Sequence, residues 1–115
     1  MKQIIFVDGS GDGRFCWYNE TTNIGNSYKM KDITSNQAEY LAIEKALENV
    51  PNNSEIEILS DSQLVVNQLN RIFHIKEDKL REFFDKIQNI IKEKKLKVTF
   101  VWIPRKNNKA GKYLG

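Results

Sequence analysis

The chain has little cysteine, histidine or proline: one, one and two residues, respectively, among 115. A single cysteine excludes an internal disulfide framework and a cysteine-based zinc site. We expect Cys16 to be a small apolar residue of a strand. His74 falls between two expected helices, and we expect it to be a surface or packing residue and not a catalytic one.

Long apolar runs are also missing. No run approaches the roughly 20 residues that a membrane span requires, and the apolar stretch at residues 4–7 is too short for a signal peptide. With 40% hydrophobic and 29% charged residues, the composition is typical of a soluble globular protein. The length predicts one domain, residues 1–115. We therefore expect a cytoplasmic, monomeric protein that does not act at a membrane.

Charge is unevenly distributed along the chain. Residues 1–70 carry five Lys and Arg against ten Asp and Glu, a net charge of −5. Residues 71–115 carry thirteen against five, a net charge of +8. The basic half suits contact with a phosphate backbone, but it is equally compatible with a solvated, lysine-rich helix face.

The hydrophobic pattern predicts the element order βββ-α-β-α-α-β. Thr34 or Ser35 is a suitable N-cap, and Ile43, Ala46 and Leu47 repeat with helical spacing after it. The expected strands are residues 2–7, 14–19, 23–31, 55–59 and 96–103, and the expected helices are residues 35–50, 62–70 and 78–94. Three antiparallel strands followed by two helix-linked strands predict an α/β fold, with a mixed five-stranded sheet flanked by helices.

Three carboxylates occupy positions where a metal site can form. Asp8 ends the first strand and Asp61 follows the fourth, so they converge if those two strands are parallel neighbours. Glu39 lies near the start of the first helix, where side chains tilt toward the N-terminus. Clustered carboxylates repel one another unless a cation compensates. Oxygen ligands without Cys or His favour Mg²⁺ or Mn²⁺. Taken singly, the three acids could instead be a turn former, a helix cap and a surface charge.

Three segments in this order resemble the signature segments of type 1 ribonucleases H. They are Asp8-Gly9-Ser10, residues 34–42 (TSNQAEYLA) and residues 60–65 (SDSQLV). The order of the elements also matches that family, and the match extends through residues 100–105 (FVWIPR). The resemblance covers nearly the whole chain. It implies a ribonuclease H-like sheet and endonucleolytic hydrolysis of the RNA strand of RNA–DNA hybrids by two divalent ions. Asp8 would bridge the ions, and Glu39 and Asp61 would complete their coordination.

The resemblance also implies a surface that binds the hybrid in its minor groove through 2′-hydroxyl contacts. Small hydroxyls and amides suit this task because they both donate and accept hydrogen bonds. Thr34 matches a position that helps hold a phosphate of the DNA strand. The matching positions are Gly9, Ser10, Thr34, Ser35, Asn36, Gln37, Ser62, Gln63, Arg105 and Lys106. For Asn36, a role as a helix-cap residue is the alternative.

The chain departs from the family pattern near its C-terminus. Family members usually carry a fourth aspartate after a segment of the type Asn-x-x-Ala, where this chain has Gly111. A histidine often found in the preceding loop is also missing. In one interpretation the protein is active, and Asn107 or Asn108 supplies a neutral oxygen or orients a water on the metal. In the other it is a ribonuclease H-like module that binds nucleic acid or protein and is weak or inactive as an enzyme.

Overall fold

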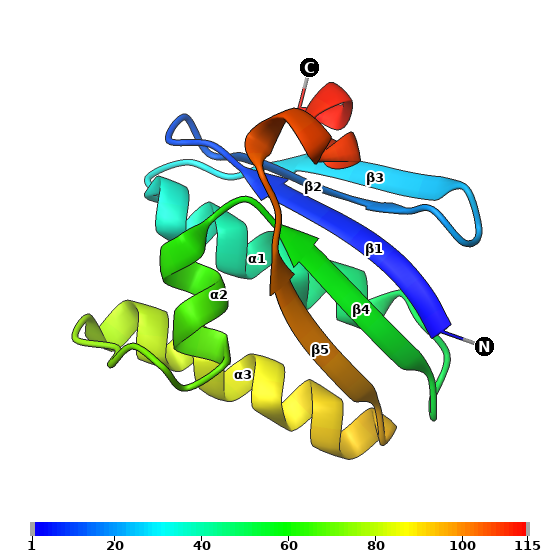
Figure 1. The fold of residues 1–115 in the computed structure, drawn as a ribbon. Helices are drawn as coiled ribbons and strands as arrows, with labels where there is room; N and C mark the ends of the chain where they lie inside the picture. Colours follow the sequence, from blue (N-terminus) through cyan, green and yellow to red (C-terminus); the bar gives the residue numbers. More distant parts are fainter. Residues whose placement is uncertain (1, 115) are drawn as a thin grey trace.

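The computed structural model describes residues 2–114, and its elements follow the predicted order (Figure 1). The bounds predicted for the second strand and the last helix are confirmed, and the bounds of the other strands and helices differ from the prediction by at most two residues at either end. The elements are β1 (Lys2–Gly9), β2 (Arg14–Asn19), β3 (Ile24–Lys29), α1 (Ser35–Glu48), β4 (Glu55–Ser60), α2 (Gln63–Leu69), α3 (Asp78–Lys94) and β5 (Lys97–Trp102). Two short 3₁₀ turns, η1 (Arg105–Asn107) and η2 (Lys109–Tyr113), follow β5.

The strands form one mixed sheet in the order β3-β2-β1-β4-β5, which confirms the predicted fold class. β1 pairs with β2, and β2 with β3, in antiparallel fashion, while β1 and β5 flank β4 in parallel. In the parallel pair Phe6 lies opposite Leu59. Two residues further along both strands, this register brings Asp8 and Asp61 to the same edge of the sheet.

Apolar side chains cover both faces of the central strands. Ile5 and Val7 face the larger core, which α1 and α3 complete, whereas Phe6 faces a smaller cluster on the opposite side of the sheet. The C-terminal turns lie beside the sheet (Figure 1), and Ala110 of η2 belongs to this smaller cluster. The central residues of β1 are therefore buried on both faces of the sheet, while Lys2 at its start is exposed.

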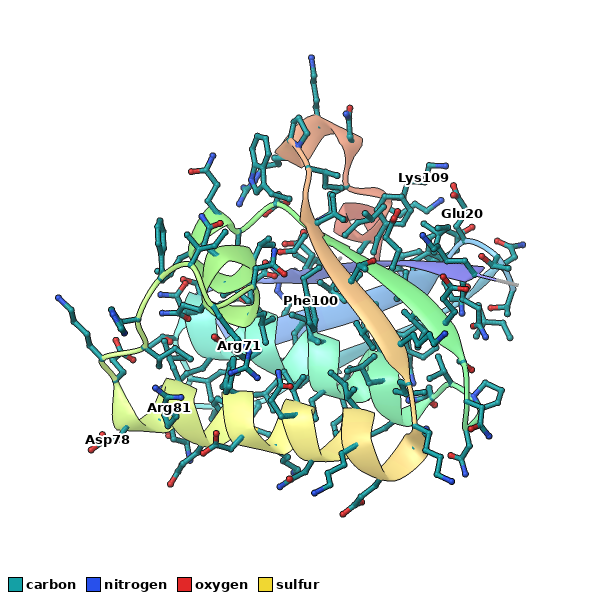
Figure 2. The ribbon with its side chains drawn as sticks, turned by 60° about the horizontal axis from the view of Figure 1, so that its bottom comes forward. Glu20, Arg71, Asp78, Arg81, Phe100 and Lys109 are labelled. Carbon is teal, nitrogen blue, oxygen red and sulfur yellow. The ribbon has the colours of Figure 1, made fainter. Side chains whose placement is uncertain are left out.

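Several contacts hold the C-terminal turns against the sheet. The Lys109 ammonium pairs with Glu20, and Figure 2 shows the two side chains together beside the β2–β3 turn. The rings of Tyr113 and Tyr18 stack with their centroids 5.3 Å apart. The Cys16 thiol donates to the Ala110 carbonyl oxygen at 3.1 Å, and burial raises the pKa of this thiol to about 12. Cys16 is thus a buried strand residue, as predicted, and the turn that carries Gly111 has a fixed position on β2.

Two further observations concern the length and apolar character of the helices and the position of the single histidine. Among the helices formed by residues 2–114, none has both the length and the apolar character needed to cross a bilayer. His74 is exposed in the segment between α2 and α3, where it lines a groove with Leu64 and Phe73.

Candidate metal centre

Asp8, Glu39 and Asp61 converge at one edge of the sheet. Each offers a carboxylate oxygen, and the three oxygens all lie within 4.8 Å of one another. Asp8 comes from β1, Asp61 directly follows β4, and Glu39 comes from the first part of α1. Oxygens bound at about 2.1 Å to one octahedral Mg²⁺ are separated by roughly 3–4 Å. The spacing of the three carboxylates therefore suits a divalent ion between them.

Gly9 allows Glu39 to reach Asp8. A Cβ atom on Gly9 would lie only 2.6 Å from the Ala38 carbonyl carbon and from the Glu39 nitrogen. The Gly9 N–H donates to Asp8 Oδ1 at 2.9 Å and to Glu39 Oε1 at 3.0 Å. The glycine after Asp8 thus brings β1 and α1 together and orients both carboxylates.

Gly9→Ala should force β1 and α1 apart and destabilise the protein. We expect a loss of about 1–3 kcal/mol in the free energy of unfolding, as for other overpacked sites, measured by urea denaturation. Gly11→Ala is the matched control, because nothing lies within 4 Å of a Cβ atom at Gly11. Equal stability of the two variants would contradict the close approach of β1 to α1.

Ser60, Asn108 and Trp102 orient Glu39 and Asp61 through hydrogen bonds. The fully buried Ser60 donates through Oγ to Glu39 Oε2 at 3.1 Å. Asn108 donates through Nδ2 to Asp61 Oδ2 at 3.0 Å, and the Trp102 indole donates to the Asp61 carbonyl oxygen at 3.1 Å. In the sequence, Ser60 belongs to the segment 60–65 and has no predicted role of its own. A serine at the buried end of an apolar strand, next to an aspartate, was the available signal.

The electrostatics of the cluster favour a bound cation. Burial raises the pKa of Asp8, and the charge of Asp61 raises it further, while the Arg105 guanidinium acts in the opposite direction. Burial raises the pKa of Glu39 well above its usual range, and the charges of Asp8 and Asp61 add to this effect. A cation would offset the repulsion that ionising the three acids creates.

Glu39→Gln should therefore stabilise the metal-free protein at neutral and alkaline pH. Since the pKa of Glu39 is higher in the folded than in the unfolded state, the folded state binds more protons between these two pKa values. Stability then falls as the pH rises through that window, and glutamine removes this loss while it can keep the bonds to Gly9 and Ser60. In EDTA at pH 8 we expect a melting temperature at least about 4 °C above wild type, which corresponds to roughly 1 kcal/mol.

The difference in melting temperature should narrow as the pH falls toward about 4, where glutamate is protonated even when unfolded. The exposed Glu93 on α3 gives the control variant Glu93→Gln, for which we expect no such pH-dependent gain. Calorimetric scans across this pH range test the prediction. A gain that is independent of pH would speak against the raised pKa of Glu39 as its cause.

Three of the residues predicted to bind the hybrid make structural contacts in this fold. Thr34 and Gln37 form a capping box, in which Thr34 Oγ1 accepts from the Gln37 N–H at 3.1 Å and Gln37 Oε1 accepts from the Thr34 N–H at 3.2 Å. Ser62 caps α2 by accepting from the Val65 N–H at 3.2 Å. Because Thr34 is the cap of α1, the alternative prediction that Asn36 is a cap residue is wrong.

The other predicted binding residues lie around the metal centre or on the nearby surface. Ser10, after Gly9, bonds to Asp12 within the turn. Asn36 lines an open groove of about 480 Å³ between α1, α2 and the segment that leads to α3. Residues of the predicted set that are exposed are Thr34, Ser35, Gln63, Arg105 and Lys106.

Gly111 occupies the position of the fourth aspartate of the family, called the fourth corner of the site below, and has no side chain. A Cβ atom on Gly111 would lie 3.8 Å from Asp8 Oδ2, so residue 111 faces the cluster as the resemblance implies. Asn107 is exposed in η1. The Asn108 Oδ1 accepts from the Ala110 N–H at 3.0 Å, and its Nδ2 is directed at Asp61. That Asn107 or Asn108 supplies an oxygen to the metal or orients a water on it stays a prediction.

Comparison with known proteins identifies the family. A family described as reverse transcriptase-like matches residues 11–114. The uncharacterized protein YpeP of Bacillus subtilis is 34% identical over 86 residues, which cover 71% of this chain and 37% of YpeP. The chain thus spans little more than a third of the length of this curated relative.

The similarity to solved structures covers a larger share of the chain than the similarity to YpeP does. LC11-RNase H1 in complex with an RNA/DNA hybrid is 30% identical, with a TM-score of 0.86 over 97% of this chain and 92% of the other. LC11-RNase H1 isolated from compost by a metagenomic approach gives 32% identity and a TM-score of 0.85, covering 98% and 91%. RNase H1 of the halophilic archaeon Halobacterium salinarum, at 23% identity, shares the fold with a TM-score of 0.85, covering 99% and 94%. The chain belongs to this reverse transcriptase-like family and to the type 1 ribonucleases H, a family of enzymes.

Proposed function

We propose that this protein hydrolyses the RNA strand of RNA–DNA hybrids endonucleolytically, with two Mg²⁺ or Mn²⁺ ions at Asp8, Glu39 and Asp61. The convergence of these three carboxylates within 4.8 Å carries the proposal. It is supported by the likeness to LC11-RNase H1, whose structure contains an RNA/DNA hybrid.

The donor set fits the proposed ions. Hard carboxylate oxygens are the ligands that Mg²⁺ and Mn²⁺ prefer, and no sulfur or imidazole is among the three. Bound ions would activate a water and stabilise the leaving oxygen of the phosphodiester. The chain's own residues fix the ligands beforehand: the Gly9 N–H orients Asp8 and Glu39, and the Ser60 hydroxyl holds Glu39 from the other side.

Basic residues beside the site suit the backbone of a nucleic acid. Arg105 lies close enough to Asp8 for its charge to lower the pKa of that acid. Arg105 and Lys106 are both exposed in η1, which follows β5 at the edge where the acids converge. Charges of this kind neutralise phosphates and give salt-dependent affinity.

Gly111 favours a second candidate function. With no side chain at position 111 beside Asp8, only the carboxylates of Asp8, Glu39 and Asp61 would hold the ions. In this alternative the protein binds nucleic acid but cuts it slowly or not at all.

A cleavage assay on a labelled RNA–DNA hybrid distinguishes the two functions. We expect the RNA strand to be cut with Mg²⁺ or Mn²⁺ and left intact in EDTA, and RNA duplex, DNA duplex and single-stranded RNA to resist cleavage. A folded protein that leaves the hybrid intact with both ions would refute the hydrolase. Retention of the hybrid in a gel shift under those conditions would favour the binding module. A monomeric state and a cytoplasmic location stay predictions.

A further inference from the structure

We infer that Asn108 is a positioning residue of the metal centre, which holds the Asp61 carboxylate and ties it to the C-terminal turns. This inference rests on the proposed metal site at Asp8, Glu39 and Asp61. It assigns Asn108 a role through its N–H group and not through its oxygen.

The carboxamide of Asn108 makes three hydrogen bonds in a buried position. The residue is only 9% exposed. Its Nδ2 donates to the Val7 carbonyl oxygen at 2.9 Å and to Asp61 Oδ2 at 3.0 Å. Its Oδ1 accepts from the Ala110 N–H at 3.0 Å. Because two of these partners are acceptors and one is a donor, only this orientation of the amide satisfies all three.

Asp61 depends on this contact more than the other two acids do. Asp8 and Glu39 accept from the backbone N–H of Gly9, which the strand holds in place. Asp61 stands after the end of β4, and the donor to its carboxylate is the side chain of Asn108, from a segment 47 residues further along the chain. Without that donor, the Asp61 side chain is free to rotate away from Asp8 and Glu39.

The Asn108 side chain also helps to fix the position of Gly111, where the fourth aspartate of the family would stand. By accepting from the Ala110 N–H, Asn108 begins η2 and keeps Ala110 buried against the sheet. Gly111 is the next residue and faces Asp8 Oδ2. Asn108 therefore connects the end of β1, the acid after β4 and the turn that carries the fourth position.

Asparagine is the residue type that meets these demands. An aspartate at position 108 would turn an oxygen toward the Val7 carbonyl and the Asp61 carboxylate, where a donor is needed. A serine retains the ability to cap η2, but its shorter side chain does not supply the N–H that reaches Asp61. Asn108→Ser thus separates the two contacts of the side chain.

The test measures Mn²⁺ binding to the full chain without nucleic acid, by electron paramagnetic resonance. We expect Asn108→Ser to weaken Mn²⁺ binding by about 10–100-fold, the usual range for residues that orient metal ligands. Asn26→Ser, at an exposed position of β3, should bind Mn²⁺ like wild type. Thermal unfolding in EDTA checks that each variant folds.

A double-mutant cycle with Asp61→Asn shows whether Asn108 acts through Asp61. In the Asp61→Asn background, the added Asn108→Ser change should alter the Mn²⁺ dissociation constant by less than about twofold. An undiminished loss there, or wild-type affinity in Asn108→Ser alone, would overturn the inference, as would a wild-type chain that binds no Mn²⁺. If wild type binds Mn²⁺ with the expected coupling but cuts no hybrid, the hydrolase proposal fails and the role of Asn108 stands.

Discussion

Asp8→Asn should lower the rate of hybrid cleavage at least about a thousandfold, which corresponds to roughly 4 kcal/mol in the activation barrier. Two unit charges about 4 Å apart interact by about 4 kcal/mol at an effective dielectric constant of 20, so removing the Asp8 charge weakens the hold on every ion at the cluster. Asparagine retains an oxygen that can accept from the Gly9 N–H, and the fold should survive. Single-turnover cleavage of a labelled hybrid in Mg²⁺ measures the effect.

Asp12→Asn is the control for this variant. Asp12 lies in the same turn, is exposed and pairs with Arg14 at 2.8 Å outside the cluster. We expect the Asp12 variant to cleave like wild type. If Asp8→Asn also cleaved at the wild-type rate, the three-carboxylate cluster would not be the site of hydrolysis.

Gly111→Asp should tighten metal binding at least about tenfold and raise the cleavage rate in Mg²⁺. The Cβ atom would make an ordinary contact of 3.8 Å with Asp8 Oδ2, so the carboxylate can enter the empty corner without displacing the backbone. About a third of the roughly 4 kcal/mol interaction between charges 4 Å apart already gives a tenfold change in affinity. Titration with Mg²⁺ in a cleavage assay and Mn²⁺ binding without substrate provide two independent measurements.

Without metal, Gly111→Asp should be less stable than wild type. A fourth acid adds repulsion to a cluster in which the pKa values of Asp8 and Glu39 are already raised. Gly111→Asn supplies the matched control, with nearly the same volume and no charge. If Gly111→Asp and Gly111→Asn both bound metal more tightly than wild type, the shape of the added side chain and not its charge would cause the gain. No change in either would mean that residue 111 does not contribute to the metal centre.

The sequence predicted the sheet because its signals are local. Strand alternation, the Thr34 cap and the glycine-rich turn after Asp8 each act within a few residues, and the order of the elements leaves few possible topologies. The convergence of Asp8 and Asp61 followed from parallel pairing of β1 and β4, which the structure has. The order of the elements was thus sufficient to place two of the three acids at one edge.

The contacts that orient the acids were less predictable, because they join residues far apart in the sequence. Ser60 bonds to Glu39 across 21 residues, and Asn108 bonds to Val7 across 101. The need for glycine at position 9 arises from a helix that begins 26 residues later. The sequence pointed to Asn107 or Asn108 after β5 but could not say which atoms of the amide face the acids, because the direction of an amide depends on neighbours that only the fold supplies.

Trp102, whose indole donates to the Asp61 carbonyl oxygen, gives the protein an intrinsic fluorescent reporter of the site. Trp102 is 43% exposed and bonds directly to the backbone of Asp61 in the proposed metal centre, whereas Trp17, the other tryptophan, is 5% exposed in the larger core. Their emission should therefore differ in wavelength and in access to soluble quenchers. Fluorescence of the unlabelled chain can thus follow events at the carboxylates through Trp102, with Trp17 as the internal reference.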